Sequence, residues 1–351
     1  AIVDDLKVYG VENILEAIEF FDKGTPLTET IVDTRTEFFK NLDFPEFDFS
    51  DVKGQESIKR CMEIAAAGGH NIILIGPPGA GKTMLAKRLP SILPPMTLRE
   101  ALETTKIHSV VGKTKDYGLM VQRPFRSPHH TISDVALVGG GQYPQPGEIS
   151  LSHNGVLFLD ELPEFKRAVL EVMRQPLEDR EVTISRARFT VTYPSSFMLV
   201  ASMNPSPSGF FNDPNSPMTS TPQEMQRYLG KISGPLLDRI DIHIEVNPVP
   251  FNKLTDDTKG EASSEIRIRV TKAREIQSNR FKDFENIHYN AQMNVKQIRE
   301  LCKLSQESKD LLKAAMEKLN LSARAYDRIL KVARTISDLA NEKDILPNHI
   351  S

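Results

Sequence analysis

Residues 76–83, GPPGAGKT, are the segment of the chain best suited to chemistry, and they match the full pattern G-x-x-x-x-G-K-[ST]. Glycines let backbone N–H groups surround a polyphosphate, while the lysine reaches the outer phosphates and the threonine hydroxyl ligates Mg²⁺. A plain glycine turn would explain the glycines but not the adjacent Lys-Thr. The pattern predicts a site for ATP and Mg²⁺ formed by Pro78, Gly79, Ala80, Gly81, Lys82, Thr83 and Met84.

An apolar run at residues 156–159 ends in two carboxylates, Asp160 and Glu161. We expect Asp160 to share Mg²⁺ with Thr83, and Glu161 to orient and deprotonate the attacking water. Two surface acids after a strand are common in isolation, but a complete phosphate loop in the same chain favours the metal site. The long separation of Asp160 from Lys82 leaves room for an insertion, for which residues 110–147 are the candidate.

Two more polar residues stand at element ends. Asn204 follows the apolar run 197–203, where its amide could bind the γ-phosphate or the attacking water; an Asn-Pro turn is the alternative. Arg239 stands at the end of a predicted helix, before the last expected strand at 241–246. An arginine directed at a phosphate stabilises transition-state charge, and another subunit can supply it. In isolation, Arg239 is more typical of a salt-bridged surface residue.

The elements that must position these residues alternate between helix and strand patterns, which is typical of a mainly parallel sheet covered by helices. Expected helices span residues 55–67, 81–92 and 166–177, and expected strands span 71–75, 156–160, 197–202 and 241–246. After Pro248-Val249-Pro250 every pattern is helical. The prediction is an α/β nucleotide-binding core followed by an all-helical lid domain.

Composition narrows the class of protein. The 351 residues include 44 Lys and Arg against 47 Asp and Glu, so any contact with a polyanion must be local. Two cysteines exclude a disulfide framework and favour a reducing compartment, so we expect a cytoplasmic protein. No apolar stretch approaches the ~20 residues that cross a bilayer, and no membrane association is expected.

Two basic clusters are candidates for a nucleic acid contact. Arg186 and Arg188 lie near the tip of a predicted hairpin, and here DNA is favoured because phosphate contacts need mobile cations without base-specific geometry. Residues 267–282 hold six basic side chains on a predicted helix. For that helix a solvated surface face is favoured over a DNA contact.

The motifs at residues 76–83, 157–162, 123–130 (RPFRSPHH) and 226–246 together resemble the magnesium-chelatase-like AAA+ ATPases of the ComM/YifB family, over about residues 5–345. The resemblance implies a P-loop NTPase AAA+ core. It also implies roles by position: Asn204 as sensor 1, Arg239 as an arginine finger acting in trans, Arg324 as the sensor 2 arginine reaching the nucleotide from the lid, and Gln55 at the start of the base pocket.

The resemblance further implies a domain plan. Residues 1–48 would be the tail of a Lon-like N-terminal domain plus a linker, and the start at Ala1 predicts a piece of a longer protein. Residues 49–248 would form the core, with a helix 2 insert at about 108–147 and a hairpin at 181–193, and residues 249–351 the lid. In related motors these two insertions face a central pore.

One departure from the family concerns zinc. Members commonly carry four cysteines around the Asn-Pro segment, where this chain has Ser206, Ser208, Met218 and Ser220. Without thiolates no soft tetrahedral site is available, so no zinc is expected.

An arginine finger acting in trans requires a neighbour, so we expect a homo-oligomeric ring, hexameric by resemblance. The leading hypothesis is an ATP-hydrolysing motor that acts on DNA as a helicase promoting branch migration in recombination or natural transformation. The alternative is a chelatase-type motor that drives Mg²⁺ insertion into a porphyrin with partner subunits. A protease-associated unfoldase is a third class, about which these residues carry no information.

Overall fold

The computed structural model describes residues 7–29, 47–112, 118–186, 189–209, 220–250, 260–284 and 287–351. The chain divides into two compact units, residues 1–43 with 96–122 and residues 44–95 with 123–351. Within the described ranges, no helix combines the length and apolarity needed to cross a membrane. The predicted domain boundaries at residues 48 and 248 stay predictions.

The smaller unit contains helices α1 (Ile14–Lys23) and α5 (Leu98–Val110). Helix α5 begins at Thr97, whose hydroxyl accepts from the Glu100 backbone N–H while the Glu100 carboxylate accepts from that of Thr97. This reciprocal cap satisfies two backbone donors that a helix start otherwise leaves unpaired. The apolar side chains of Met96, Ala101, Leu119 and Val121 pack beside it.

The larger unit is built on the predicted parallel sheet, which is confirmed. Five parallel strands run in the order β2 (Phe125–Arg126), β5 (Val156–Leu159), β8 (Met198–Met203), β1 (Ile72–Ile75) and β9 (Ile242–Glu245). Strand β2 was not predicted. It lies in the block that the sequence assigned to an insertion, and a strand of two residues is too short to show a strand period.

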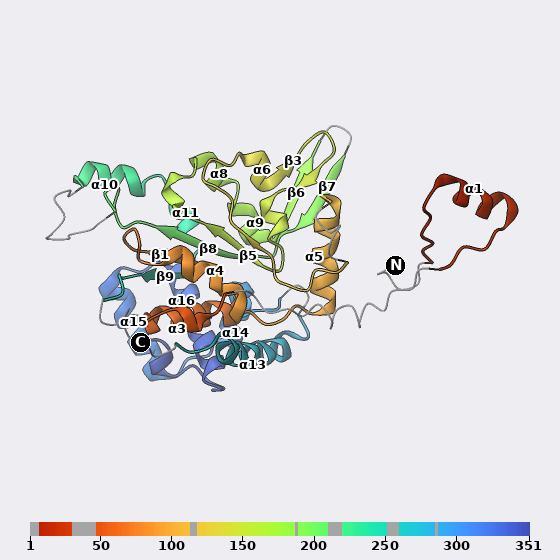
Figure 1. Ribbon diagram of the computed structural model, residues 1–351. Helices are drawn as coiled ribbons and strands as arrows, with labels where there is room; N and C mark the ends of the chain where they lie inside the picture. The colour runs from red at the N-terminus through yellow and green to blue at the C-terminus, as the bar shows by residue number, and fades with distance from the viewer. Residues whose placement is uncertain are drawn as a thin grey trace. The chain divides into compact units, whose positions relative to one another are not determined.

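Helices cover both faces of the sheet, so its strands read as continuous apolar runs. Because side chains alternate along a strand, Ile72 and Leu74 join one core and Ile73 the other. The first core contains α3 (Glu56–Gly68), α4 (Lys82–Ile92) and α13 (Ser263–Phe281); the second contains α8 (Arg167–Glu171), α9 (Arg174–Asp179), α10 (Pro222–Leu229) and α11 (Gly234–Leu237) (Figure 1).

Two small hairpins extend the second side of the sheet, together with short helical segments. The hairpins are β3 (Gly139–Gly140) with β4 (Gln145–Pro146), and β6 (Glu181–Ser185) with β7 (Thr190–Pro194), close to the predicted 181–193. The short segments are α6 (Asp134–Val138), α7 (Glu148–Leu151) and η2 (Leu162–Glu164). The short segment η1 (Phe49–Asp51) lies on the other side, where Phe49 joins the first core.

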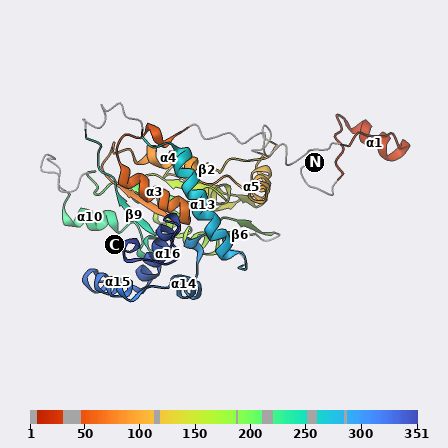
Figure 2. The same cartoon turned by 90° about the horizontal axis from the view of Figure 1, so that it is seen from below.

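The C-terminal region is helical, as predicted. After α13 it comprises η3 (Asn290–Gln292), α14 (Val295–Leu301), α15 (Gln306–Leu319), α16 (Ala323–Leu339) and η4 (Pro347–His349). Helices α13 and α16 pack together against α3 (Figure 2).

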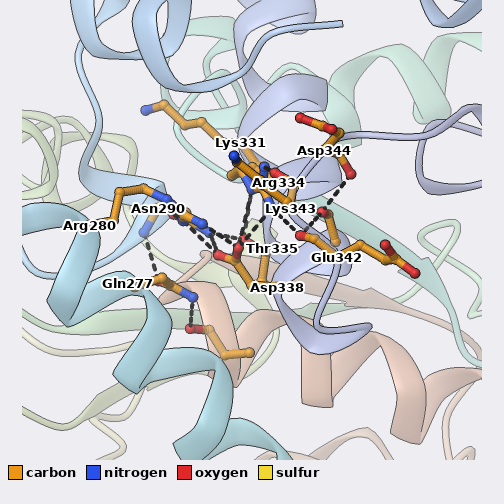
Figure 3. A network of polar contacts seen from close by, with 12 residues as sticks. Gln277, Arg280, Asn290, Lys331, Arg334, Thr335, Asp338, Glu342, Lys343 and Asp344 are labelled. Carbon is orange, nitrogen blue, oxygen red and sulfur yellow. Dashed lines mark hydrogen bonds and ion pairs between the residues drawn. The ribbon is translucent and has the colours of Figure 1, made fainter. Parts of the chain in front are cut away.

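The Asp338 side chain is fully buried and accepts hydrogen bonds from Arg280, Asn290 and Arg334 (Figure 3). Breaking a buried ionic network of this kind typically costs several kcal/mol, so Asp338 is a principal anchor of the helical region.

The basic helix at residues 267–282 is not simply the solvated face that the sequence favoured. Arg269 pairs with Glu63 and Glu261. Arg274 donates to the Ala66 carbonyl and stacks over the Tyr289 ring at 3.8 Å. Arg280 binds Asp338. These cations fasten α13 to neighbouring elements, which removes most of the helix from consideration as a DNA contact.

Candidate active site

The loop between β1 and α4 has the backbone geometry that a phosphate site needs. Gly79 and Gly81 adopt φ values of 78° and 88°, in the left-handed region that side chains disfavour. At Gly76 an added Cβ would lie 2.2 Å from the Val246 carbonyl oxygen, so that position has room only for glycine. Helix α4 begins at Lys82 directly after Gly81. Free N–H groups at such a helix start favour an anion.

Lys82 is held across the mouth of this loop. Its Nζ donates to the carbonyls of Gly76 at 2.5 Å and Pro77 at 2.9 Å, and to Asn204 Oδ1 at 3.0 Å. Burial lowers the pKa of Lys82, while Asp160 and Glu161 oppose that shift. An ammonium with three N–H donors has used all of them here, so a phosphate would have to replace at least one of these carbonyl partners.

Thr83 and Asp160 meet at the carboxyl edge of the sheet. The Thr83 hydroxyl donates to Asp160 Oδ2 at 2.8 Å, and the buried Ser202 hydroxyl donates to Asp160 Oδ1. Hard oxygen donors of this kind suit Mg²⁺. Sequence reasoning missed Ser202. The available signal was a hydroxyl residue near the end of a strand that is otherwise almost wholly apolar.

Glu161 occupies an unusual backbone conformation beside this cluster. Its φ is 55°, in the left-handed region, and its backbone N–H donates to Ser202 Oγ at 3.2 Å. A non-glycine residue in that region costs of order 1–3 kcal/mol and often marks a functional site. The side chain is exposed, which leaves its carboxylate accessible to water at the same sheet edge.

Asn204 follows β8 and reaches the loop through Lys82. Its backbone carbonyl accepts a hydrogen bond from the Tyr228 hydroxyl at 3.1 Å. Sequence reasoning did not select Tyr228. Burial raises the pKa of Tyr228 to about 12, so its hydroxyl remains a donor over the physiological range. Tyr228 thereby ties α10 to the residue after β8.

Gln55 lies beside the phosphate loop. Its Nε2 donates to the Ala80 carbonyl at 3.0 Å, while Oε1 is buried without a partner among the described residues. A buried acceptor without a donor is costly and points to a missing group.

Two other residues of the predicted site lie beside the loop. Pro78 faces Gly209, where an added Cβ would lie 3.0 Å from Pro78 Cδ. Met84 is 37% exposed on the first turn of α4.

Serines occupy three of the four positions at which the sequence resemblance implied cysteines. Ser206 Oγ lies 2.9 Å from Ser208 Oγ, and Ser220 donates to Ser208 at 3.1 Å. Met218, the fourth position, lies outside the described residues. Hydrogen-bonded hydroxyls join the two ends of this loop, and the expected absence of zinc stays a prediction.

The amino edge of the same sheet carries a cleft of about 590 Å³. Residues just before the strands line it, including Asn71, Gly155 and Asp241. Seven basic side chains also line it, against four acidic ones: Arg123, Arg180, Arg239, Arg274, Arg324, Arg328 and Lys331 against Glu178, Asp238, Asp241 and Asp327. The cleft therefore carries a surplus of positive charge.

Arg239 and Arg324 both lie in this cleft. Arg239 pairs with the exposed Glu178 and donates to the Pro235 carbonyl at 2.8 Å. Arg324 is 73% exposed and pairs with Asp238 at 3.0 Å. The four residues of β1 span roughly 13 Å at 3.3 Å per residue and separate this edge from the phosphate loop. Arg324 is therefore too far from the phosphate loop of its own subunit to reach a triphosphate bound there. It could reach only a nucleotide bound by another subunit.

The β6–β7 hairpin carries Arg186 at its tip, as predicted. Its guanidinium is exposed, and it donates to the Ser185 carbonyl. Arg188 lies outside the described residues. No contact among the described residues brings Arg186 near the phosphate loop.

Two family models match the chain: the magnesium chelatase subunit ChlI over residues 48–254, and the ChlI C-terminal region over residues 260–351. This chain is 46% identical to competence protein ComM of Haemophilus influenzae over 100% of the chain's own length. It is 48% identical to the uncharacterized protein YifB of Escherichia coli over 87% of the chain's own length. A chloroplastic magnesium-chelatase subunit, ChlI-2 of Arabidopsis thaliana, is 21% identical over 86% of the chain. The chain spans 68%, 59% and 66% of these relatives.

Proposed function

The chain belongs to the ComM/YifB family of magnesium-chelatase-like AAA+ ATPases, and from that premise we propose that it is the ATPase core of a ring-forming motor that acts on DNA. The observation that carries the proposal is the separation of two half-sites: phosphate-binding residues at one sheet edge and arginines at the other.

The phosphate half-site fits ATP and Mg²⁺. Thr83 and Asp160 would hold Mg²⁺, which when bound neutralises phosphate charge. The backbone N–H groups of Gly79 to Gly81 and the Lys82 ammonium would cradle the phosphates. The unpartnered Oε1 of Gln55 would accept a hydrogen bond from the exocyclic amine of the base.

Hydrolysis needs a base and an orienting group beside the γ-phosphate. Glu161 would take a proton from the attacking water, and the Asn204 amide would hold that water or the phosphate. Ser202 acts through both carboxylate residues, since it binds the Asp160 side chain and the Glu161 backbone. It is a positioning residue rather than a catalytic one.

The second half-site completes the first only between subunits. Arg239 and Arg324 would enter the ATP site of a neighbouring copy, where Arg239 stabilises transition-state charge. Head-to-tail contacts of this kind close into a ring, hexameric by family resemblance. A cytoplasmic location stays a prediction.

DNA is the proposed substrate, with branch migration in recombination or natural transformation as the activity. Support comes from the similarity to a competence protein, which covers all of this chain and 68% of that relative, and from the exposed Arg186. The alternative, a motor that drives Mg²⁺ insertion into a porphyrin, rests on the 21% identical chelatase subunit.

The deciding experiment is ATP hydrolysis by the full-length assembled protein with single-stranded, duplex or branched DNA. We expect DNA to accelerate turnover. If no form of DNA does so, the proposed substrate is wrong, whereas the proposed ATPase stands as long as basal hydrolysis is measured.

A further inference from the structure

Two aromatic rings meet at the tips of the two hairpins of the larger unit. Tyr143, in the turn between β3 and β4, and Phe189, in the turn just before β7, have ring centroids 6.3 Å apart. They are 71% and 47% exposed. Large aromatic side chains gain by burial, so an exposed pair supported by other elements calls for an explanation.

The hairpins are packed firmly enough to hold the rings in place. The Tyr193 hydroxyl of β7 donates to the Pro144 carbonyl in the other turn at 2.9 Å. A Cβ on Gly139 would lie 2.7 Å from Ile184 Cδ1, so glycine allows the close approach of β3 to β6, which lie side by side in Figure 1. The rings are therefore presented by a paired support rather than by one loop.

The two chain segments that carry the rings have charged residues of a single sign. Residues 135–147 and 182–194 contain no Asp or Glu, and their only charged residues are Arg186 and Arg188. A Cβ on Gly140 would lie 3.0 Å from Arg186 Nη2, which sets that guanidinium against the β3–β4 hairpin. Within the described ranges Arg186 forms no ion pair. The chain as a whole has a formal charge of −3, so this surface, free of acidic residues, differs locally from the rest.

Hydroxyl groups line the solvent side of the same hairpin. Thr183, Ser185, Thr190 and Thr192 are exposed, and Thr183 and Thr192 face each other at 3.0 Å. Hydroxyls and arginines are common partners of phosphate oxygens, while aromatic faces bind unpaired bases by stacking. A duplex leaves no base faces free for exposed rings.

We propose that Tyr143 and Phe189 form a stacking platform for the bases of single-stranded nucleic acid, with Arg186 and the hairpin hydroxyls on its phosphates. This inference rests on the proposed function and gives it a strand type and a contact mode. It predicts sequence-tolerant binding, because every base has a π face.

The test uses a Phe189→Trp variant of the full-length protein. These 351 residues contain no Trp, and the unsubstituted full-length protein is titrated alongside to subtract the emission of any Trp elsewhere. Its fluorescence is titrated with oligothymidine and with an abasic oligomer of the same length, which keeps the phosphates but has no bases. Binding constants of Tyr143→Ala and Phe189→Leu are measured alongside. The control is Phe47→Leu, an aromatic residue that is 39% exposed and packs over Arg88.

We expect oligothymidine to change the Trp emission of Phe189→Trp. We also expect it to bind Tyr143→Ala and Phe189→Leu roughly tenfold more weakly than the parent protein. The abasic oligomer should bind weakly to every variant. If both oligomers bind alike and neither ring matters, stacking is wrong while the DNA motor stands. If no DNA binds the parent protein, the proposed function fails as well. If casein, an unfolded polypeptide, binds through these rings instead, the partner class is wrong.

Discussion

The carboxyl and amino edges of one five-stranded sheet are organised in opposite ways. At the carboxyl edge the Thr83 and Ser202 hydroxyls both donate to Asp160, and Lys82 donates to Asn204. At the amino edge Arg324 is largely exposed, and Arg239 has an exposed partner, Glu178. At the carboxyl edge the polar side chains are paired with one another within the subunit. At the amino edge the arginines are exposed or paired with exposed acids, so they could bind a group on a neighbouring subunit.

The largest effect should come from removing the cation at the amino edge. We expect Arg239→Ala to lower the turnover of the full-length ring by about 10³- to 10⁵-fold, because a finger arginine stabilises charge formed only in the transition state. Steady-state hydrolysis at saturating ATP measures it. A loss below tenfold would mean that Arg239 only pairs with Glu178.

Glu161→Gln at the carboxyl edge should lower turnover by about 10²- to 10⁴-fold, since the amide cannot accept the proton from water. Binding of ATP should persist, which a labelled nucleotide in a filter or anisotropy assay can follow. Continued hydrolysis at the parent rate would assign the base to another residue.

Mixing these two inactive variants sharpens the comparison. If the edges combine between subunits, an equal mixture pairs an intact Glu161 with an intact Arg239 at roughly a quarter of random interfaces. Activity should then reappear in the mixture. If Arg239 served its own subunit, no interface would hold both groups and the mixture would stay inactive.

A third change tests what fixes the helical region that carries Arg324. Asp338→Asn leaves Arg280 and Arg334 without a buried counter-charge, and we expect a loss of about 3 kcal/mol in the free energy of unfolding. Chemical denaturation measures it. Glu317→Gln is the control, because its exposed pair with Lys313 at 4.0 Å should contribute less than about 1 kcal/mol. Equal effects would contradict the anchoring role.

The smallest change probes the connection within the carboxyl edge. Ser202→Ala removes the donor to Asp160 and the acceptor of the Glu161 N–H, and a roughly tenfold loss in turnover is expected from misaligned carboxylates. Ser150→Ala is its control, since the buried Ser150 hydroxyl has no partner among the described residues. If both variants hydrolyse ATP equally, Ser202 does not position the site.

Much of the core and the phosphate half-site could be predicted because the signals are local. Residues 76–83 form a recognisable phosphate loop by themselves. The apolar runs of β5 and β8 lead into Asp160 and Asn204, and the common direction of parallel strands places both at the edge where β1 leads into that loop. Strand β2 and the partners of α13 escaped prediction. The two residues of β2 are too few to show a strand period. The sequence also cannot show whether Arg280 is solvated or paired, because its partner Asp338 lies 58 positions away on another helix.

The sequence alone determined which residues are the candidates for a triphosphate site, because backbone flexibility and side-chain chemistry within eight consecutive positions suffice to identify them. Only the tertiary structure decided that Arg239 and Arg324 lie at the far edge from the phosphate loop. Strand direction and the packing of α16 set that separation, and both arise from contacts between segments remote in the chain.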